Sequence, residues 1–493
     1  MENQNEEATH LSEEDIRLEK LADLRKNNIN PFEYSYKKTH QSTYVLENFD
    51  HLEPGEHHEE TLTLAGRITA KRNHGKAYFG NLQDEEGTVQ FYSNKSIIGE
   101  ELFDLLLSLD TGDIIGIEGT PFKTRRGELT VQVSKFILLT KSLLPLPEKY
   151  HGLQNIELRY RHRYIDLIAN ADIKPTFKTR STIIHLIRSY LHNQAFMEVE
   201  TPVLHNIYGG ASAKPFSTFH NELNQDLYLR IALELHLKRL IVGGFEKVFE
   251  IGRVFRNEGL SYKHNPEYTL LELYEAYSDY NDMMSLTEQL LGYIVEKING
   301  STKITYKDQV IDFKPPFKRL KLTDAIQDAC NIDPFDEDQL RSKATELKLD
   351  IPKNASKGHL IMELYDKVIE PTLIQPTFII DHPWETSPLA KKHRDNDQLV
   401  ERFELIINGM EIANSFTELN DPIDQHERFK DQLKAKELGQ EDAQEMDEDF
   451  IKALKHGMPP TGGLGIGIDR VVMLLTNSVS IRDVIFFPHM KDK

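Results

Sequence analysis

Between residues 61 and 139 the chain alternates apolar and polar side chains in five short runs that are separated by turn sequences. The runs span 61–71, 77–83, 88–93, 113–119 and 129–139. Alternation with a period of two predicts β-strands, and the breaks between the runs predict tight turns. A helical pattern over 98–106 separates the third strand from the fourth. This region is therefore expected to form a small all-β unit.

Five strands with a helix after the third is the element order of an OB-fold, a small barrel that often binds single-stranded nucleic acid. We place this domain at residues 57–142. Alternation predicts that Val89 and Phe91 face the barrel core, and that Phe79 and Gln90 face outward. An exposed phenylalanine beside an amide suits base stacking and base recognition. Two ordinary strand residues at a partly covered barrel mouth fit the same pattern.

Further elements are expected on both sides of the barrel. Residues 1–56 form a lead-in with a first helix over about Glu13 to Lys26, and residues 143–175 form a linker. From about residue 176 to the end the pattern is α/β. The stretch from about 321 to 374 has helical spacing without a chemical constellation, which indicates an inserted helical subdomain.

The first helix has Leu18 and Leu21 on its apolar stripe, and Ser12 is a good N-cap. Its opposite face carries Arg17 and Lys20. That face is either solvated or available to RNA.

Composition narrows the compartment and the type of site. The chain has 493 residues, a formal net charge of −20 and one cysteine, Cys330. One cysteine excludes an internal disulfide and a cysteine-based zinc site, so we expect a cytoplasmic protein without zinc. No window approaches a membrane span, so no membrane partner is expected. The acidic total opposes RNA binding, but basic clusters such as 123–126 leave RNA open as a partner.

Three common active-site signatures are absent from the sequence. They are the GxxxxGK[ST] phosphate loop, the HExxH metal helix and the GxSxG nucleophile elbow. Any nucleotide chemistry must therefore use another scaffold.

The sequence Phe255-Arg256-Asn257-Glu258 follows an apolar, β-branched run and is expected to continue a strand. Alternation then places Arg256 and Glu258 on one face. An arginine can bind a phosphate or carboxylate with two hydrogen bonds, and a glutamate can accept from an amine. The pair suits ATP, although a surface ion pair on an edge strand explains it equally simply.

A second candidate is a hairpin with Asn408-Gly409 between two strand-like runs. A two-residue turn pairs Ile406 with Glu411, so Glu404 and Glu411 become diagonal neighbours on one face. Two carboxylates held together favour a cation, and phosphate-bound Mg²⁺ is the usual one. A solvated pair of glutamates is the alternative.

Other carboxylates gather near this hairpin in the sequence. Strict alternation places Asn414, Phe416 and Glu418 on the opposite face from Glu411, so one β-bulge is needed to bring them into the same site. With Glu234 and Glu272 in addition, such a site would suit a small molecule that carries two amines. Each glutamate taken alone fits an ordinary solvent-facing position.

The third candidate is the glycine-rich run at 462–467, which leads to Arg470 and an apolar helix. Glycines permit close approach to the backbone, and an arginine at a helix N-terminus favours an anion. Tight packing between strand and helix is the structural alternative.

These sequences stand in the order of the three signature motifs of class II aminoacyl-tRNA synthetases. FMEVETP at 196–202 resembles the first motif, FRNE at 255–258 with KHNPEY at 263–268 the second, and GIGIDR at 465–470 the third. Over nearly its whole length the chain resembles the subclass b lysyl-tRNA synthetases of bacterial type. The resemblance implies a catalytic domain at 176–493 built on an antiparallel sheet flanked by helices.

The resemblance also implies roles for individual residues. Those implied for ATP are Arg256, Glu258, His264, Asn265, Tyr268, Glu404, Glu411 and Arg470. Among these, Arg256 and Arg470 are the catalytic pair, and Glu404 and Glu411 are the Mg²⁺ ligands. Those implied for lysine are Gly210, Glu234, Arg256, Glu272, Tyr274, Asn414, Phe416 and Glu418. Those implied for the anticodon are Arg72, Phe79, Gln90 and Glu128.

The activity implied is formation of lysyl-adenylate from lysine and ATP, with transfer to the 3′ end of tRNA(Lys). A homodimer is implied through the first motif, around Pro202. Two alternatives remain at this point. One is an aspartyl- or asparaginyl-tRNA synthetase, which shares the barrel and motifs. The other is a non-catalytic RNA-binding relative.

Overall fold

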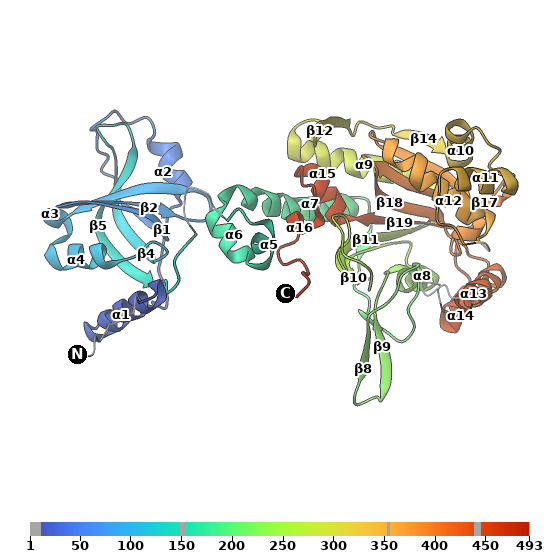
Figure 1. The fold of residues 1–493 in the computed structure, drawn as a ribbon, viewed down its shortest axis with the longest axis horizontal. Coiled ribbons are helices and arrows are strands. Elements are labelled where there is room, and N and C mark those ends of the chain that lie inside the picture. The colour runs from blue at the N-terminus through green and yellow to red at the C-terminus, as the bar shows by residue number, and fades with distance from the viewer. Residues whose placement is uncertain (1–10, 148–152, 353–354, 438–444, 493) are drawn as a thin grey trace, which may run out of the picture. The chain divides into compact units, whose positions relative to one another are not determined.

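The computed structural model describes residues 11–147, 153–352, 355–437 and 445–492 (Figure 1). The chain separates into two compact units, Met1–Ala171 and Asp172–Lys493. The first ten residues of the predicted lead-in, the last residue, and residues 148–152 of the predicted linker lie outside the described residues, as do 353–354 and 438–444.

The first unit is built around a closed five-stranded barrel, as the alternation predicts. Its strands are β1 (Leu62–His74), β2 (Ala77–Gln83), β3 (Thr88–Asn94), β4 (Ile114–Lys123) and β5 (Leu129–Thr140). They close in the order β1-β2-β3-β5-β4. Two short helices, α3 (Lys95–Ile98) and α4 (Glu100–Ser108), occupy the place of the single helix expected after the third strand. This is the OB-fold arrangement.

Alternation assigns the barrel interior correctly but not all of its exterior. Val89 and Phe91 are buried, as predicted. Gln90 is also buried, contrary to the prediction, because its Oε1 accepts a hydrogen bond of 3.1 Å from Thr130 Oγ1 on neighbouring strand β5. Phe79 is half-buried, and its ring lies 4.8 Å from the ring of Tyr92.

The lead-in contains α1 (Glu13–Lys26) and α2 (Ser42–Phe49). The bounds of α1 and its Ser12 cap are as predicted, but the apolar stripe is not. Leu18 is exposed, whereas Arg17 is buried beside Leu21. The Arg17 guanidinium turns inward because it donates to three backbone carbonyls, those of Thr111, Ser142 and Leu144. Arg17 therefore is not part of a solvated or RNA-facing surface.

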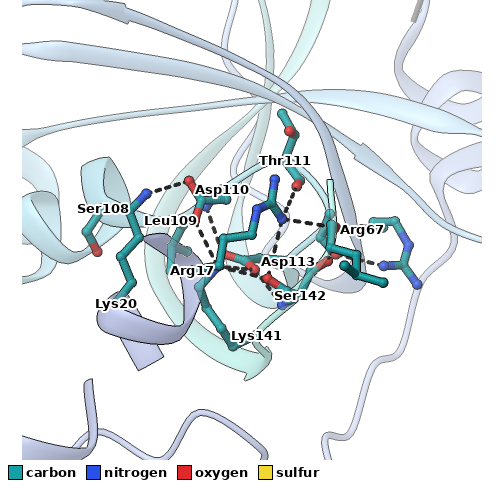
Figure 2. Close-up of polar contacts among 12 residues, drawn as sticks. Arg17, Lys20, Arg67, Ser108, Leu109, Asp110, Thr111, Asp113, Lys141 and Ser142 are labelled. Carbon is teal, nitrogen blue, oxygen red and sulfur yellow. Dashed lines mark hydrogen bonds and ion pairs between the residues drawn. The ribbon is translucent and has the colours of Figure 1, made fainter. Parts of the chain in front are cut away.

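A buried charge network ties α1 to the barrel (Figure 2). The Lys141 ammonium, at the end of β5, lies 2.9 Å from carboxylate oxygens of Asp110 and Asp113. Lys20 of α1 reaches Asp110 at 2.6 Å. Both Lys141 and Asp113 are buried, so each charge depends on the other for compensation.

Two short helices complete the first unit, α5 (Ile156–Arg161) and α6 (Arg163–Ala169). They carry the basic cluster that precedes the second unit in sequence. Arg159 pairs with Asp166 at 2.8 Å, and the buried Arg163 pairs with the same carboxylate at 2.6 Å. Both arginines are therefore held by internal ion pairs, and Arg163 is also buried.

The second unit is built on a nine-stranded sheet with the main order β14-β15-β17-β18-β19-β11-β10-β6. Its strands are β6 (Met197–Glu198), β10 (Lys247–Phe255), β11 (Glu267–Ala276), β14 (Lys318–Lys321), β15 (Thr377–Pro383), β16 (Lys392–His393), β17 (Asn396–Ile407), β18 (Met410–Thr417) and β19 (Thr461–Gly467). The pairs at the two ends, β14 with β15 and β10 with β6, are parallel. The remaining pairs are antiparallel, so the sheet is mixed rather than wholly antiparallel.

Helices cover the sheet (Figure 1). They are α7 (Lys174–Asn193), α8 (Glu234–Val242), α9 (Tyr280–Asn299), α13 (Pro422–Glu437), α14 (Glu448–Lys455), α15 (Ile468–Leu475) and α16 (Ile481–Val484), with the short 3₁₀ helices η1 (Ala171–Ile173) and η3 (Trp384–Thr386). Side chains of α7, α9 and α15 pack with Leu271 and Leu273 of β11 and with Leu464 and Ile466 of β19. One face of the central strands is thereby filled with apolar side chains.

Smaller elements complete this unit. A three-stranded sheet contains β7 (Leu204–His205), β8 (Ser217–His220) and β9 (Gln225–Leu229), and a hairpin contains β12 (Lys303–Tyr306) and β13 (Gln309–Asp312). The stretch predicted as a helical insertion contains α10 (Leu322–Cys330), α11 (Glu337–Glu346), α12 (Lys357–Val368) and η2 (Glu370–Thr372). These helices pack on Ile379 and Ile406 of the main sheet.

Replacing Lys141 with methionine should destabilise the barrel, because it leaves the buried carboxylate of Asp113 without its cation. We expect a loss of about 3 kcal/mol in the opening free energy of barrel amides, measured by hydrogen exchange on the full chain. Lys95→Met, which breaks an exposed pair with Glu100 in the same unit, should cost less than about 0.5 kcal/mol. Equal losses for the two variants would contradict the assigned role of Lys141.

Candidate functional site

The centre of the main sheet is a strand almost without side chains on one face. In β19, Leu464 and Ile466 point into the apolar core, so Gly463, Gly465 and Gly467 face the other way. A cavity of about 910 Å³ lies over this glycine face. The glycines thus leave room for the cavity at the centre of the sheet. They also permit a ligand to approach the backbone closely, as the sequence suggested.

The neighbouring strands place functional side chains on either side of these glycines. Gly463 lies between Tyr274 of β11 and Phe416 of β18, while Gly465 lies between Glu272 and Asn414. A Cβ atom at position 463 would lie only 1.9 Å from Glu418 Oε1. Side-chain volume at this position would therefore conflict with the acidic end of the cavity.

The cavity brings together every residue that the sequence assigns to ATP, to lysine or to metal. Those that line it are Gly210, Glu234, Arg256, Glu258, His264, Asn265, Tyr268, Glu272, Tyr274, Glu404, Glu411, Asn414, Phe416, Glu418 and Arg470. They come from three strands, β11, β17 and β18, from two helices, α8 and α15, and from several loops that are far apart in the sequence. The fold therefore brings all of these residues to one cavity.

The hairpin between β17 and β18 forms as predicted. Ile406 pairs with Glu411, and the turn residues Asn408 and Gly409 have φ angles of 51° and 64°. Both residues of the turn are therefore in the left-handed region that a two-residue hairpin of this type requires.

The β-bulge expected from the sequence is present after the second residue pair from the turn. The register shifts between Ile406 and Leu405, because Leu405 pairs with Ala413 rather than with Ile412. The extra residue on β18 changes the alternation, so Glu411 and Asn414 both line the cavity.

Arg256 and Glu258 reach the cavity by a route that differs from the prediction. Strand β10 ends at Phe255, so neither residue lies on a strand face. The Arg256 amide donates to the carbonyl of Pro266 at 2.8 Å, and its guanidinium lies 5.4 Å from the centre of the Tyr268 ring. Backbone pairing between two loop segments, rather than strand alternation, brings them to the site.

A basic group lies at the end of the cavity where α15 begins. The Arg470 guanidinium donates to the Glu411 carbonyl at 2.6 Å and lies 3.5 Å from His264 Nε2. Burial, followed by the charge of Arg470, lowers the pKa of His264. A neutral imidazole beside two arginines leaves this end suited to an anion.

The opposite end of the cavity is acidic, and its carboxylates are buried. Glu272 Oε1 accepts from the Leu233 amide at 3.0 Å, and Glu272 Oε2 accepts from the Tyr274 hydroxyl at 3.1 Å. Burial, followed by the charge of Glu234, raises the pKa of Glu272 to about 7. A carboxylate in this position gains from any ammonium group that enters the cavity.

Two charged residues that hold the site together were missed from the sequence. Lys238 is fully buried and pairs with both Glu234 and Glu418. Its spacing of four residues from Glu234, which becomes one turn of helix α8, is a signal that could have found it. Arg402 donates to Glu404 at 2.6 Å and to Asn414 at 3.1 Å, and it alternates with Glu404 along β17.

The two proposed metal ligands line the cavity from adjacent strands. Arg402 binds one oxygen of Glu404, and Arg470 lies 3.5 Å from Glu411 Oε2. Among the described residues, no group of three or more histidines, cysteines or carboxylates is arranged to hold an ion alone. Burial, and then Glu370 and Glu404, raise the pKa of nearby Asp366 to about 7. This surplus of carboxylates fits a divalent cation whose remaining ligands come from a phosphate.

The residues assigned to the anticodon lie on the barrel. Arg72 of β1 pairs with Phe79 of β2, and Phe79 pairs with Tyr92 of β3. Arg72 and Glu128 are exposed. The ring of Tyr92 lies 5.8 Å from that of Phe122, so Phe79 belongs to an aromatic row that crosses the barrel strands.

Comparison with known proteins agrees with this geometry. Residues 155–491 match the tRNA synthetases class II (D, K and N), and residues 62–139 match the OB-fold nucleic acid binding domain. The lysine–tRNA ligase of Bacillus subtilis (strain 168) is 54% identical over 97% of both chains. Those of Oceanobacillus iheyensis and Carboxydothermus hydrogenoformans are each 52% identical over 97% of this chain and 98% of theirs.

The chain belongs to the lysine–tRNA ligase family of class II tRNA synthetases. Members of this family are aminoacyl-tRNA synthetases, so the expected fold, motifs and enzyme class are confirmed. The class II match covers all of the residues that line the cavity, and the OB-fold match covers the five barrel strands. Within the described part of the chain, no helix has the length and apolar character needed to cross a membrane.

Proposed function

We propose that this protein joins L-lysine to ATP as lysyl-adenylate and then transfers the lysyl group to the 3′ end of tRNA(Lys). The observation that supports the proposal is the division of one cavity into an acidic end with three buried glutamates, Glu234, Glu272 and Glu418, and a basic end with Arg256 and Arg470. A substrate with two ammonium groups fits the first end, and phosphates fit the second.

The acidic end takes the amino acid. Glu234 and the Gly210 backbone bind the α-ammonium group. Glu272, Tyr274 and Glu418 surround the ε-ammonium group, and Asn414 and Phe416 line the space between. An aspartate side chain would be repelled by these carboxylates, and an asparagine side chain would leave them unpaired, so both should be rejected strongly.

The basic end takes ATP. Tyr268 stacks on adenine, and Glu258 accepts from the adenine amino group. His264 and Asn265 contact the outer phosphates, and Arg470 lies over the purine and reaches the γ-phosphate. Arg256 binds both the amino-acid carboxylate and the α-phosphate, because its planar guanidinium can make parallel hydrogen bonds to oxyanions.

The chemical step needs no protein nucleophile. A carboxylate oxygen of lysine attacks the α-phosphorus, a new P–O bond forms, and the bond to the β-phosphate oxygen breaks to release pyrophosphate. Arg256 and Arg470 hold the two reactants in line and neutralise the charge that develops on the phosphoryl oxygens. When it is bound with ATP, Mg²⁺ held by Glu404 and Glu411 supplies further charge neutralisation at the phosphates.

The barrel takes the anticodon. Phe79 offers a stacking surface, and Arg72, Gln90 and Glu128 offer hydrogen bonds to the bases or backbone. Gln90 is buried and its Oε1 accepts from Thr130 Oγ1, so its part in anticodon binding is to donate from the side-chain NH₂ group.

Two further features complete the proposal. The protein is a homodimer through the first class II motif, because apolar side chains near Pro202 are exposed in the single chain, including Met197, Val203 and Leu204. It acts in the cytoplasm, where its one cysteine stays reduced and charged tRNA is used.

Amino-acid-dependent ATP–pyrophosphate exchange tests the assignment directly. Lysine should support rapid exchange, whereas aspartate and asparagine should support less than about a thousandth of that rate. Equal exchange with the three amino acids would contradict the lysine assignment. No exchange with any of the twenty would support a non-catalytic protein.

Gly463→Ala should block the amino-acid end of the cavity. Its Cβ would meet Glu418 Oε1 at 1.9 Å and the Tyr274 ring at 2.5 Å, so the KM for lysine in exchange should rise by about 100-fold. Gly465→Ala is the matched variant on the same strand face, and its Cβ has no neighbour nearer than 3.8 Å. It should have a much smaller effect, and the reverse order would contradict this placement of lysine.

Phe79→Ala should separate the two parts of the reaction. The KM for tRNA(Lys) should rise by about tenfold, the worth of one stacked base, while exchange without tRNA stays unchanged. Tyr34→Ala removes an exposed aromatic ring from the same unit, outside the five barrel strands, and should change neither. Loss of exchange in Phe79→Ala would contradict the anticodon role.

A further inference from the structure

The ammonium group of Lys238 lies inside the carboxylate cluster of the amino-acid end. Helix α8 places Lys238 one turn after Glu234, and its Nζ lies 2.5 Å from Glu234 Oε1. The same Nζ contacts Glu418 Oε2, just beyond the end of β18. The lysine side chain has no exposed surface. It is therefore a permanent part of the cluster.

Lys238 stands behind the cavity rather than in it. Glu234, Glu418 and Phe416 line the cavity, whereas Lys238 is not among the described residues that do so. The rings of Phe416 and Phe450 lie 5.4 Å and 5.9 Å from its Nζ and cover the ammonium group. A substrate therefore meets the two carboxylates and not the cation that holds them.

Charge decides what this arrangement can accept. The carboxylates of Glu234, Glu272 and Glu418 are all buried, and among the described residues Lys238 is the one cation that contacts two of them. When all three carboxylates are ionised, the cluster of three carboxylates and one fixed ammonium carries two negative charges. Free lysine carries two ammonium groups, so its charge matches the pocket, whereas most amino acids carry one. Burial makes any mismatch costly.

We propose that Lys238 is a positioning residue for substrate selection, which holds Glu234 and Glu418 side by side in ionised form so that the pocket matches an amino acid with two ammonium groups. The proposal rests on the proposed function, because free lysine is the occupant. Lys238 touches neither substrate in this arrangement and acts through the two carboxylates.

The charge states support this role. Burial raises the pKa of both Glu234 and Glu418, and the ammonium of Lys238 is the largest opposing influence on each. Burial also opposes the charge of Lys238, but the two carboxylates outweigh it and raise its pKa. Without Lys238, the pKa values of the two carboxylates would rise further, so the carboxylates would be protonated more often. A substrate ammonium group would then have to displace these protons to bind.

The other ionisable groups that face this cluster come from neighbouring strands. Arg402 of β17 acts on Glu234, and Glu272 and Tyr274 of β11 act on Glu418 and Glu234. Arg402 has its own hydrogen bonds to Glu404, Asn414 and Ser387. Tyr274 is neutral, because burial and then Glu234 hold its pKa well above its usual range. None of these groups contacts both carboxylates as Lys238 does.

Lys238→Met tests the proposal, because it keeps an unbranched apolar stem and removes the ammonium group. In ATP–pyrophosphate exchange, the KM for lysine should rise by about 100-fold at a pH of about 7, with the KM for ATP unchanged. The pH dependence separates charge from structure. As pH rises, the carboxylates lose the extra proton, and the KM for lysine should fall back toward the value of the wild type at the same pH.

Arg239→Met is the matched control, since it removes a cation from the same helix whose partners, Asp447 and Asp449, lie outside the cavity lining. It should leave the KM for lysine unchanged. If Lys238→Met does not fold, Lys238→Gln keeps hydrogen-bond donors without charge and should show the same pH-dependent rise.

Three results would overturn the proposal: an unchanged KM for lysine, a KM raised by one factor at every pH, or a KM for ATP that rises in step. Wild-type exchange is measured first. Its absence with lysine would contradict the proposed function itself, whereas normal wild-type exchange with an unaltered Lys238→Met would contradict only the role of Lys238.

Discussion

The site depends on the absence of side chains along one face of β19, the central strand of the sheet. Gly463, Gly465 and Gly467 leave a floor of bare backbone, while Leu464 and Ile466 on the reverse face anchor the same strand in the apolar core. A central strand normally fills both faces, because both are buried. Here one face of the strand carries no side chains at three positions, and the strands on either side supply the polar side chains that form the walls of the cavity.

The cavity walls carry opposite charges at the two ends of the cavity. The fold creates this separation because it brings basic and acidic side chains from different elements to opposite ends. Arg256 and Arg470 come from a loop and a helix start, whereas Glu272 and Glu418 come from a strand and a strand end. Because the carboxylates at its acidic end are buried, the charges there are weakly screened and must balance closely. The proposed mechanism relies on positioning rather than on a protein nucleophile, and positioning needs such a rigid frame.

Much of this could be predicted where the physical cause is local. Alternation predicts the barrel strands and the burial of Phe91, and the Asn408-Gly409 turn fixes the pairing of Ile406 with Glu411. The need for a bulge after Glu411 also follows from counting residues, although the position of the bulge does not. Motif resemblance then names the ligands of a cavity that no single pattern could assemble.

The prediction errors arise where groups far away in the sequence determine whether a side chain is buried. Arg17 turns inward because backbone carbonyls about a hundred residues away in the sequence accept its hydrogen bonds. Gln90 is buried because its side chain accepts a hydrogen bond from Thr130 on the adjacent strand β5.

One consequence follows from a residue of the cavity wall. The chain contains a single tryptophan, Trp384, which lines the cavity. The ammonium of Lys392 lies 5.8 Å from its ring. Tryptophan emission depends on local polarity and charge, so the protein carries one intrinsic optical probe in the wall of the cavity.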